Sequence, residues 1–254
     1  MSPRIRLALF VISLLGFAAI FAAGARELKP VGQYPGPYGD VLNAAAVPER
    51  HTTDVVTAIN FDYRGFDTLG EEFILFGSVM GVLLLLRQTQ DERRKENPEE
   101  EAGGGPQASD AMRGFTLALV GPLAVFGLYI VLHGQLTPGG GFQGGLIIAT
   151  APLMVYLSGR LEEFKAVTSP HVIEVAEAVG AGGFALAGFL GLLAGRNFLA
   201  NVLPLGKTGN VFSSGTILLI SVLTGIEVAA GIVLAIRAFL EHALEIELKG
   251  GKTR

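Results

Sequence analysis

The 254-residue sequence has no cysteine and no tryptophan, and only 17% of its residues are charged. Without cysteine the chain supplies no disulfide, no thiolate metal ligand, no iron–sulfur ligand and no cysteine nucleophile. An ordinary globular domain has about a quarter of its residues charged, whereas here half are hydrophobic and 35 are glycine. The net charge of −4 gives no reason to expect a nucleic-acid partner. Because the apolar residues fall in long runs, this composition indicates a membrane protein.

Six uncharged, apolar runs predict an all-α fold, a polytopic membrane helix bundle of about six transmembrane helices. A helix needs about 20 mostly apolar residues to cross a membrane. The runs cover residues 7–25, 73–86, 115–132, 142–157, 179–194 and 215–236. The second and fourth runs are short, so we expect flanking residues to complete them. The first run follows basic residues as a signal peptide does, but its length of about 19 residues exceeds the usual 7–15-residue apolar region and favours an uncleaved anchor.

Lysine and arginine are distributed unevenly over the segments between these runs. If the six runs cross the membrane in turn, most of the 19 basic residues fall on the side of the N-terminus. Because basic residues are enriched in cytoplasmic loops, the pattern predicts that both termini are cytoplasmic. We expect a multi-pass protein of the cell (inner) membrane.

A hydrophilic segment at residues 91–110 separates the second run from the third. It has dense charge of both signs, three successive glycines and two prolines, so it cannot bury apolar surface and is interpreted as a solvated linker. The predicted organisation is a two-span unit at residues 1–90, this linker, a four-span unit at residues 111–243 and a polar tail at residues 244–254.

A long motif, DVVTAINFDYRGFDTLGEE, ends the loop between the first two runs. Its apolar residues from Val55 onward are spaced as in an amphipathic helix at the membrane surface. The motif resembles the small two-span unit of Mrp-type multisubunit cation/proton antiporters, which is the C-terminal part of their large A subunit and a separate subunit in related membrane-bound hydrogenases. The resemblance implies that Asp67 and Glu71 take part in ion translocation, and it assigns no role to Glu72. The alternative is that these carboxylates only stabilise a helix N-terminus.

A second motif, LHGQLTPGGGFQGGLI, links the third and fourth runs. It lacks the Lys-Ser/Thr pair of a phosphate-binding loop, so its glycines predict close backbone approach or a helix break. The motif resembles the signature of the Mrp antiporter B subunit, a four-span protein. The residues marked by this resemblance are Pro138, Gly139, Gly140, Gly141, Phe142, Gly144 and Gly145. His133, which precedes them, is either a proton relay, since histidine titrates near neutrality, or a surface residue at a helix end.

Glu227 is the one acidic residue deep within a run, with Thr224 and Gly231 on its helix face. A carboxylate at mid-membrane costs at least ~2.5 kcal/mol, so it must face protein or water. We expect Glu227 to belong to an ion path, the alternative being a protonated structural residue.

Two further patterns concern the helix of the fifth run. His171, Glu174 and Glu177 precede it at three-residue spacing, and we interpret them as a solvated first turn rather than the mouth of a path. Small residues at four-residue spacing predict tight helix packing. They are Gly183, Ala187, Gly191 and Gly195 on this helix, with Gly77 and Gly81 on the helix of the second run.

The resemblances together imply a membrane subunit of a multisubunit Na⁺/H⁺ antiporter that contributes to the ion path and to assembly. Pumping channels of that family lie in large complex I-like subunits with lysines at mid-membrane, and no lysine falls within a run here. We therefore expect a non-enzymatic subunit without a cofactor or metal site, surrounded by lipid and bound to complex I-like and small membrane subunits, with Na⁺ and H⁺ as the ions. Two alternatives stay open: the equivalent subunit of a redox-driven ion pump such as a membrane-bound hydrogenase, and a structural scaffold. The candidate ion-path residues are Asp67, Glu71, His133, Thr224 and Glu227.

Overall fold

A computed structural model describes residues 3–28, 32, 37–86, 108–159 and 161–251 of the chain. The regular structure of these residues is helical throughout, with no strand, which confirms the predicted all-α class. The chain divides into two compact units, Met1–Gly39 and Asp40–Arg254. Most of the linker predicted at residues 91–110 lies outside the described residues, and helix α6 begins at its last residue, Asp110.

Unit 1 contains helix α1 (Pro3–Arg26), whose stretch Leu7–Arg26 is apolar and long enough to cross a membrane. Its large side chains are exposed along the whole helix, for example Phe17 at 77% and Phe21 at 82%. A helix that is apolar on every face suits a lipid environment or a partner helix rather than water. The first predicted span is therefore confirmed as a helix of membrane-spanning length.

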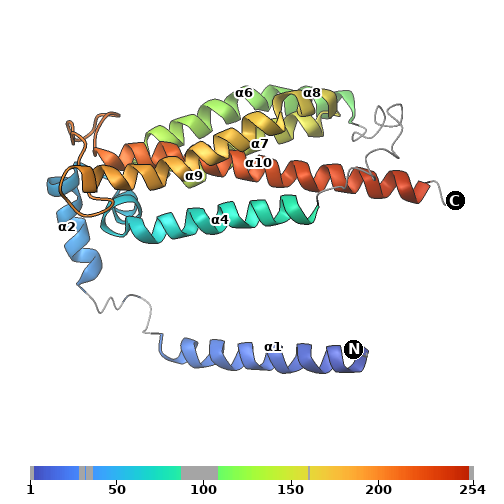
Figure 1. The fold of residues 1–254 in the computed structure, drawn as a ribbon, viewed down its shortest axis with the longest axis horizontal. Helices are drawn as coiled ribbons and strands as arrows, with labels where there is room; N and C mark the ends of the chain where they lie inside the picture. The colour runs from blue at the N-terminus through green and yellow to red at the C-terminus, as the bar shows by residue number, and fades with distance from the viewer. Residues whose placement is uncertain (1–2, 29–31, 33–36, 87–107, 160, 252–254) are drawn as a thin grey trace. The chain divides into compact units, whose positions relative to one another are not determined.

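Unit 2 contains the remaining helices, arranged around α10 (Figure 1). Helix α10 packs against α9, α7 and α4, and α6 packs chiefly against α7. The helices are α2 (Tyr38–Arg50), α3 (Val55–Ala58), the π-helix η1 (Ile59–Tyr63), α4 (Gly65–Leu85), α6 (Asp110–Leu132), α7 (Gly141–Leu157), α8 (Leu161–Val167), α9 (Pro170–Leu193) and α10 (Thr216–Gly251). Helix α4 thus packs against helices of the predicted four-span unit, although a charged segment separates them in the sequence.

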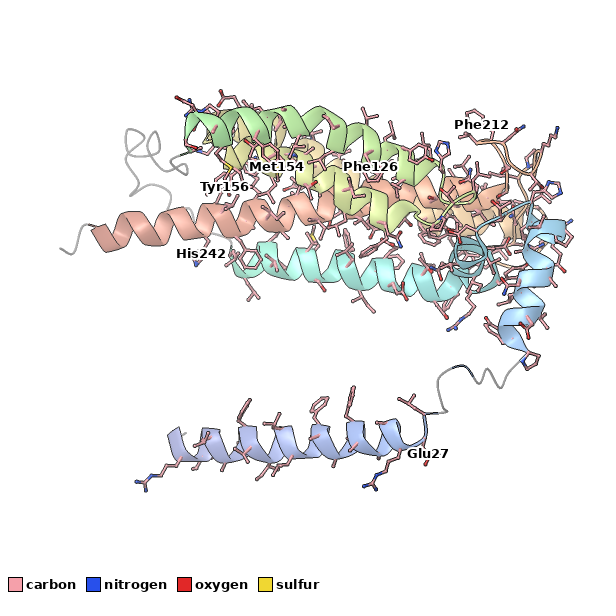
Figure 2. All side chains as sticks on the ribbon, turned by 180° about the vertical axis from the view of Figure 1, so that it is seen from behind. Glu27, Phe126, Met154, Tyr156, Phe212 and His242 are labelled. Carbon is pink, nitrogen blue, oxygen red and sulfur yellow. The ribbon has the colours of Figure 1, made fainter. Side chains whose placement is uncertain are left out.

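Each of the six apolar runs forms a helix, and five helices in the described part of the chain are long and apolar enough to cross a membrane. The sixth, α7, has 17 residues, or about 26 Å of helix. Several helices begin earlier than their apolar runs: α4 begins at Gly65 and α9 at Pro170, a favoured residue for a first helical turn. Many large apolar side chains project outward from unit 2, among them Phe126 and Phe212 (Figure 2).

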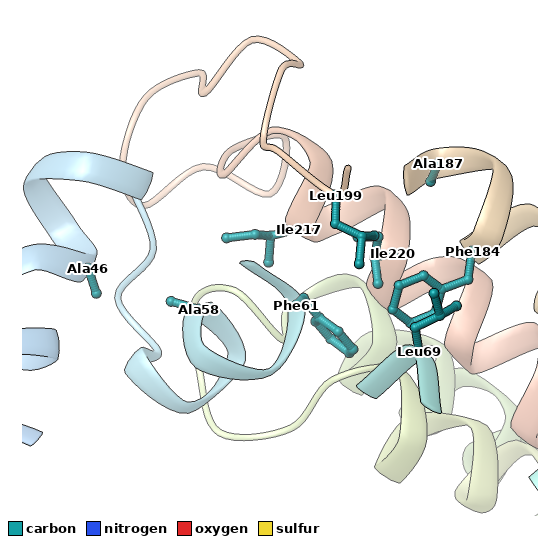
Figure 3. Close-up of a cluster of buried hydrophobic side chains, with 9 residues drawn as sticks. All are labelled: Ala46, Ala58, Phe61, Leu69, Phe184, Ala187, Leu199, Ile217 and Ile220. Carbon is teal, nitrogen blue, oxygen red and sulfur yellow. The ribbon is translucent and has the colours of Figure 1, made fainter. Parts of the chain in front are cut away.

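The hydrophobic core of unit 2 lies where η1, the start of α4 and the start of α10 meet the end of α9 (Figure 3). We call this end of unit 2 the loop end, and the opposite end, where α8 lies, the α8 end. Phe184, Ile217 and Ile220 are fully buried at the centre of the core. The other members are Ala46, Ala58, Phe61, Leu69, Ala187 and Leu199. Because its helical members come from six helices, α2, α3, η1, α4, α9 and α10, the core fixes the positions at which α4 and α10 begin.

The loop between α9 and α10 is held to η1 by polar contacts. Nδ2 of Asn201 donates to Oδ2 of Asp62 at 3.0 Å, and Oδ1 of Asn201 accepts from the backbone N–H of Thr216 at 2.8 Å, at the first residue of α10. Nε of Arg50 lies 2.7 Å from the same Asp62 oxygen and forms an ion pair with it. The N–H of this Nε does not point toward the oxygen, so the contact is not a hydrogen bond. Burial and a hydrogen bond to Glu49 raise the pKa of Tyr63 to about 12, so its hydroxyl stays protonated at physiological pH.

Replacing Arg50 by alanine should lower the stability of the loop end by about 1–3 kcal/mol. The Asp62 side chain is only 7% exposed. Without the guanidinium of Arg50, the Asp62 carboxylate would keep the side-chain amide of Asn201 as a hydrogen-bond donor but would have no positive charge beside it. The measurement is thermal unfolding of the detergent-purified complex. Arg196→Ala is the control, because Arg196 is exposed and no ion pair joins it to another described residue. Equal unfolding temperatures for the two variants would contradict the expectation.

Candidate functional site

Three buried carboxyl groups, one from each of three helices, form the centre of the candidate site, and we call them the carboxyl cluster. Glu72 on α4 is 2% exposed, Glu177 on α9 is 1% exposed and Glu227 on α10 is fully buried. Five carboxyl oxygens of these residues are shielded from solvent and accept no hydrogen bond of normal geometry from any described residue. They are both oxygens of Glu177, both oxygens of Glu227 and Oε2 of Glu72. Buried polar groups are nearly always paired, so these oxygens indicate a site that something else completes.

Two glycines allow the helices of the carboxyl cluster to come this close. A Cβ added to Gly180 on α9 would lie 2.6 Å from both the backbone N and the Cβ of Glu227. A Cβ added to Gly231, one turn beyond Glu227 on α10, would lie 3.3 Å from Oε1 of Glu177. The backbones of α9 and α10 therefore touch beside Glu227, and Glu177 lies over α10 one turn further toward the α8 end.

Glu227 interacts with each of the other two carboxyl groups. Glu72 and Glu227 are close enough for both charge and hydrogen-bond interaction, although no standard hydrogen bond joins them. Glu227 also interacts by charge with Glu177. None of the three has an ion pair with a described lysine, arginine or histidine. Helix α7, which packs against the same part of α10, contains no charged residue.

Carboxylates so placed cannot all carry a bare negative charge. Like charges that are close together in an apolar interior repel strongly, and burial removes the water that would stabilise them. The charge must be neutralised by protons or by a bound cation. In the described ranges no group of three or more His, Asp or Glu side chains is close enough to hold a metal ion together. The arrangement is thus suited to holding and exchanging protons.

Thr224 extends the polar surface of α10 by one turn. Its side chain is fully buried and its Oγ1 has no hydrogen-bond partner among the described residues. It faces the start of α7, since a Cβ on Gly141 would lie 2.7 Å from the Cβ of Thr224. The structure therefore brings Thr224 and Glu227 together on one stretch of α10, as their spacing in the sequence predicts.

The glycine motif forms the turn into α7 and its contact surface. Gly139 and Gly140 have φ values of 154° and 115°, which side chains with a Cβ rarely adopt. The next three motif glycines, Gly141, Gly144 and Gly145, face the backbones of α6 and α10, where an added Cβ would lie 2.2–2.7 Å from a carbonyl oxygen. The predicted close backbone approach is thus present. Pro138 and Phe142 are exposed at the loop end.

The remaining candidate residues lie nearer the loop end. Asp67 is in the first turn of α4, 47% exposed, and forms an ion pair with Arg64. Glu71 is exposed and is the charged neighbour of buried Glu72. His133 is the C-cap residue that follows α6, and its ring stacks on Tyr129 at 4.1 Å between centroids. The structure does not place these three side chains within the carboxyl cluster.

Two of the three cluster residues are not predicted by the sequence. The motif resemblance assigns no role to Glu72, and the interpretation of Glu177 as part of a solvated first turn is wrong, because Glu177 is 1% exposed. Helix α9 begins at Pro170, so Glu177 lies in the third turn and faces α10, while Glu174 and His171 are exposed as expected. The available signal was spacing, because Glu177 shares a helix face with the buried small residue Gly180.

The small-residue stripes differ in what they contact. On α9, Gly183 faces Leu223 of α10 and Gly191 faces the following loop. The prediction that Gly195 belongs to the stripe is wrong, because α9 ends at Leu193 and Gly195 lies in the turn after it, with open space around it. Gly77 and Gly81 on α4 also have nothing from the described residues within 4 Å. The part of the stripe that lies on α9 therefore packs within the chain, and helix packing at Gly77 and Gly81 stays a prediction.

Comparison with known families matches residues 111–234 to a domain related to the MnhB subunit of Na⁺/H⁺ antiporter. An uncharacterised protein of Methanocaldococcus jannaschii is 29% identical over 206 residues, which are 73% of this chain and 75% of that protein. A Staphylococcus aureus protein named as antiporter subunit mnhB2 is 40% identical over 52 residues, which are 20% of this chain and 37% of that protein.

Two solved structures have chains similar to this one. A chain of the membrane-bound sulfane sulfur reductase, an archaeal respiratory membrane complex, is 32% identical with a TM-score of 0.71, over 93% of this chain and 98% of that one. A chain of the Mrp complex from a Dietzia species has a TM-score of 0.69 at 23% identity, over 94% of this chain but 26% of that one, and so shows the fold. Residues 111–234 are therefore an MnhB-related domain, and over nearly its whole length the chain is similar to a chain of an archaeal respiratory membrane complex.

Proposed function

We propose that the chain is a membrane subunit of a multisubunit Na⁺/H⁺ antiporter and that its carboxyl cluster is part of the ion path. The observation that carries the proposal is Glu227, fully buried in the middle of an apolar helix with both carboxyl oxygens unpartnered among the described residues. An ionisable residue inside a membrane helix is costly and usually marks a path for ions or protons. The MnhB-related domain that contains it supports the same function.

In this proposal the chain moves ions but catalyses no reaction, and its neighbours complete the path. The exposed apolar faces of α1 and α4 are available to small membrane subunits, to complex I-like pumping subunits and to lipid. Both termini lie in the cytoplasm of a cell whose inner membrane holds the complex, and residues 1–90 and 111–243 correspond to two subunits fused through a linker. Asp67 and Glu71 lead toward the carboxyl cluster from the loop end, with Thr224 beside it, and His133 remains a candidate at the end of α6.

A second candidate is the equivalent subunit of an ion-pumping redox complex. It is favoured by one observation, the match to a chain of an archaeal respiratory complex over nearly the full length of both chains. In that case the whole assembly is an oxidoreductase, although this chain itself does not take part in the redox reaction.

Purification of the complex through a tag on this chain tests both candidates. We expect mass spectrometry to find complex I-like and small membrane subunits, and vesicles with the complex to exchange Na⁺ for H⁺. Vesicles from cells lacking the chain should lose this exchange. Co-purifying iron–sulfur subunits, with proton movement only on addition of an electron acceptor, would favour the redox complex. Unchanged exchange in the absence of the chain would overturn the proposal.

A further inference from the structure

A row of acidic side chains on α4 extends from the carboxyl cluster toward the loop end. Helix α4 begins at the loop end (Figure 1), with exposed Asp67 in its first turn. Glu71 is exposed one turn later, and its charge acts on the neighbouring buried Glu72. Glu72 in turn interacts with Glu227 of α10. Acidic groups therefore extend from the surface at the loop end to the middle of the bundle. The consecutive residues Glu71 and Glu72 point to different sides of α4, so a proton would need a bridging water to pass between them.

A second row of ionisable side chains, on α9, extends from the carboxyl cluster in the opposite direction. This helix begins beside α8 (Figure 1), so its first residues lie at the other end of unit 2. Glu177 is buried and interacts with Glu227, and the charge of Glu174 acts on Glu177. Glu174 and His171, three and six residues before Glu177, are exposed. Residues three apart lie on one helix face, so this row connects Glu227 with the surface at the α8 end.

Both rows meet at Glu227, near the middle of the membrane-spanning part of α10. At 1.5 Å per residue, Glu227 lies about 16 Å from the start of the helix at Thr216 and about 15 Å from Arg237. Guanidinium Nη1 of Arg237 donates to the carbonyl oxygen of Thr168 just after α8, which places Arg237 at the α8 end. The acidic row on α4 ends at Glu72 and the row on α9 ends at Glu177, so neither row alone reaches across, whereas the two rows joined by Glu227 do.

We infer that Glu72, Glu227 and Glu177 form a proton relay through this chain, open at Glu71 on the loop end and at Glu174 on the α8 end. The inference rests on the proposed function and adds to it the ion and the route. In each step the O–H bond of one carboxylic acid breaks as a neighbouring carboxylate accepts the proton, directly or through a bridging water. No electron is transferred, and the net charge of the relay changes only when a proton enters or leaves at an end.

The chemistry of the cluster favours protons over Na⁺. A dehydrated hard cation needs several oxygen ligands around it, and in the described ranges no three acidic side chains are close enough to share an ion. A proton needs one carboxyl oxygen at a time. The carboxyl oxygens of Glu177 and Glu227 and the Oγ1 of Thr224 have no hydrogen-bond partner among the described residues, so they are free to accept or pass a proton.

Glu177→Gln in the complete complex tests the route. We expect proton flux in vesicles to fall by about tenfold or more, because an amide cannot transfer a proton as a carboxyl group does. Glu177→Asp, which keeps the carboxyl group, should keep part of the flux. Glu162→Gln is the matched control, an exposed acid at the same end of unit 2, and should change nothing. Co-purification of the subunits shows that each variant assembles.

Infrared difference spectroscopy tests the ion. Wild-type complex should absorb as protonated carboxyl groups, with a shift in heavy water, and Glu227→Gln should remove part of that absorption. Added Na⁺ should leave it unchanged, and its loss on Na⁺ addition would overturn the assignment to protons. If Glu227→Gln abolishes exchange while Glu177→Gln keeps full proton flux, the route through α9 is wrong and the proposed function stands. If both variants keep full activity, both proposals fail.

Discussion

Glu227→Gln should lower Na⁺/H⁺ exchange by the complex by about tenfold to hundredfold without preventing its assembly. Glutamine has nearly the same shape as glutamate but cannot ionise, so it fills the same space between α9 and α10. Replacing a buried charge by a neutral group of similar volume is often neutral or stabilising. We therefore expect the unfolding temperature of the purified complex to stay the same or rise slightly while exchange is lost.

The measurement is the collapse of an imposed pH gradient in vesicles on addition of Na⁺, normalised to the amount of assembled complex. Glu227→Asp keeps the carboxyl group but withdraws it by one methylene from Glu72, and should retain an intermediate rate. Glu241→Gln is the control on the same helix: Glu241 is 51% exposed and pairs with Arg237 at the surface, where an ion pair contributes little.

The opposite result has an equally clear meaning. If Glu227→Gln assembles normally and exchanges ions at the wild-type rate, the carboxyl cluster serves packing alone and the chain is a structural scaffold. If Glu227→Gln loses both assembly and exchange, the loss is explained by a structural role of Glu227. The Glu227→Asp variant then decides: if it assembles normally but exchanges ions at a reduced rate, Glu227 belongs to the ion path, because a purely structural carboxyl group would not set the rate of exchange.

The sequence predicts the helices and Glu227 because both depend on local composition. An apolar run long enough to cross a membrane must satisfy its backbone internally, so it forms a helix wherever it lies. A single acid inside such a run is visible without a structure. The glycine motif is similar: its residues predict close backbone approach, and Gly141, Gly144 and Gly145 make such contacts with neighbouring helices.

Composition alone does not predict that Glu72 and Glu177 are buried, because they lie in the charged flanks of apolar runs. Whether a flanking residue is solvated depends on where its helix begins and on what packs against it. Pro170 starts α9 well before the apolar run, and contact of Gly180 with the backbone of Glu227 turns that face of α9 inward. On α4 the adjacent acids Glu71 and Glu72 point in different directions, and only packing against α10 decides which is buried.

Gly141→Val should prevent accumulation of the folded subunit, because Gly141 has no room for a side chain. A Cβ at this position would lie 2.2 Å from the carbonyl oxygen of Ser221 and 2.8 Å from the backbone N of Gly225, both on α10. A flexible side chain could move aside, but helical backbone cannot, so α7 must shift away from α10. Overpacking of a core usually costs about 1–3 kcal/mol, and contact with rigid backbone places this variant at or above the upper value.

The amount of subunit in purified membranes, and the unfolding temperature of any complex that forms, measure this effect. Gly141→Ala should give a smaller loss, since it adds one methyl group against the same atoms. Gly182→Ala is the matched control, because Gly182 lies within α9 with nothing from the described residues within 4 Å, and alanine is favoured over glycine inside a helix by about 1 kcal/mol. Normal assembly of Gly141→Val would mean that α7 and α10 are further apart than described. Gly141 would then no longer cover Thr224 from the side of the loop end. The carboxyl cluster would in that case be reachable from the loop end along α10 as well as along α4.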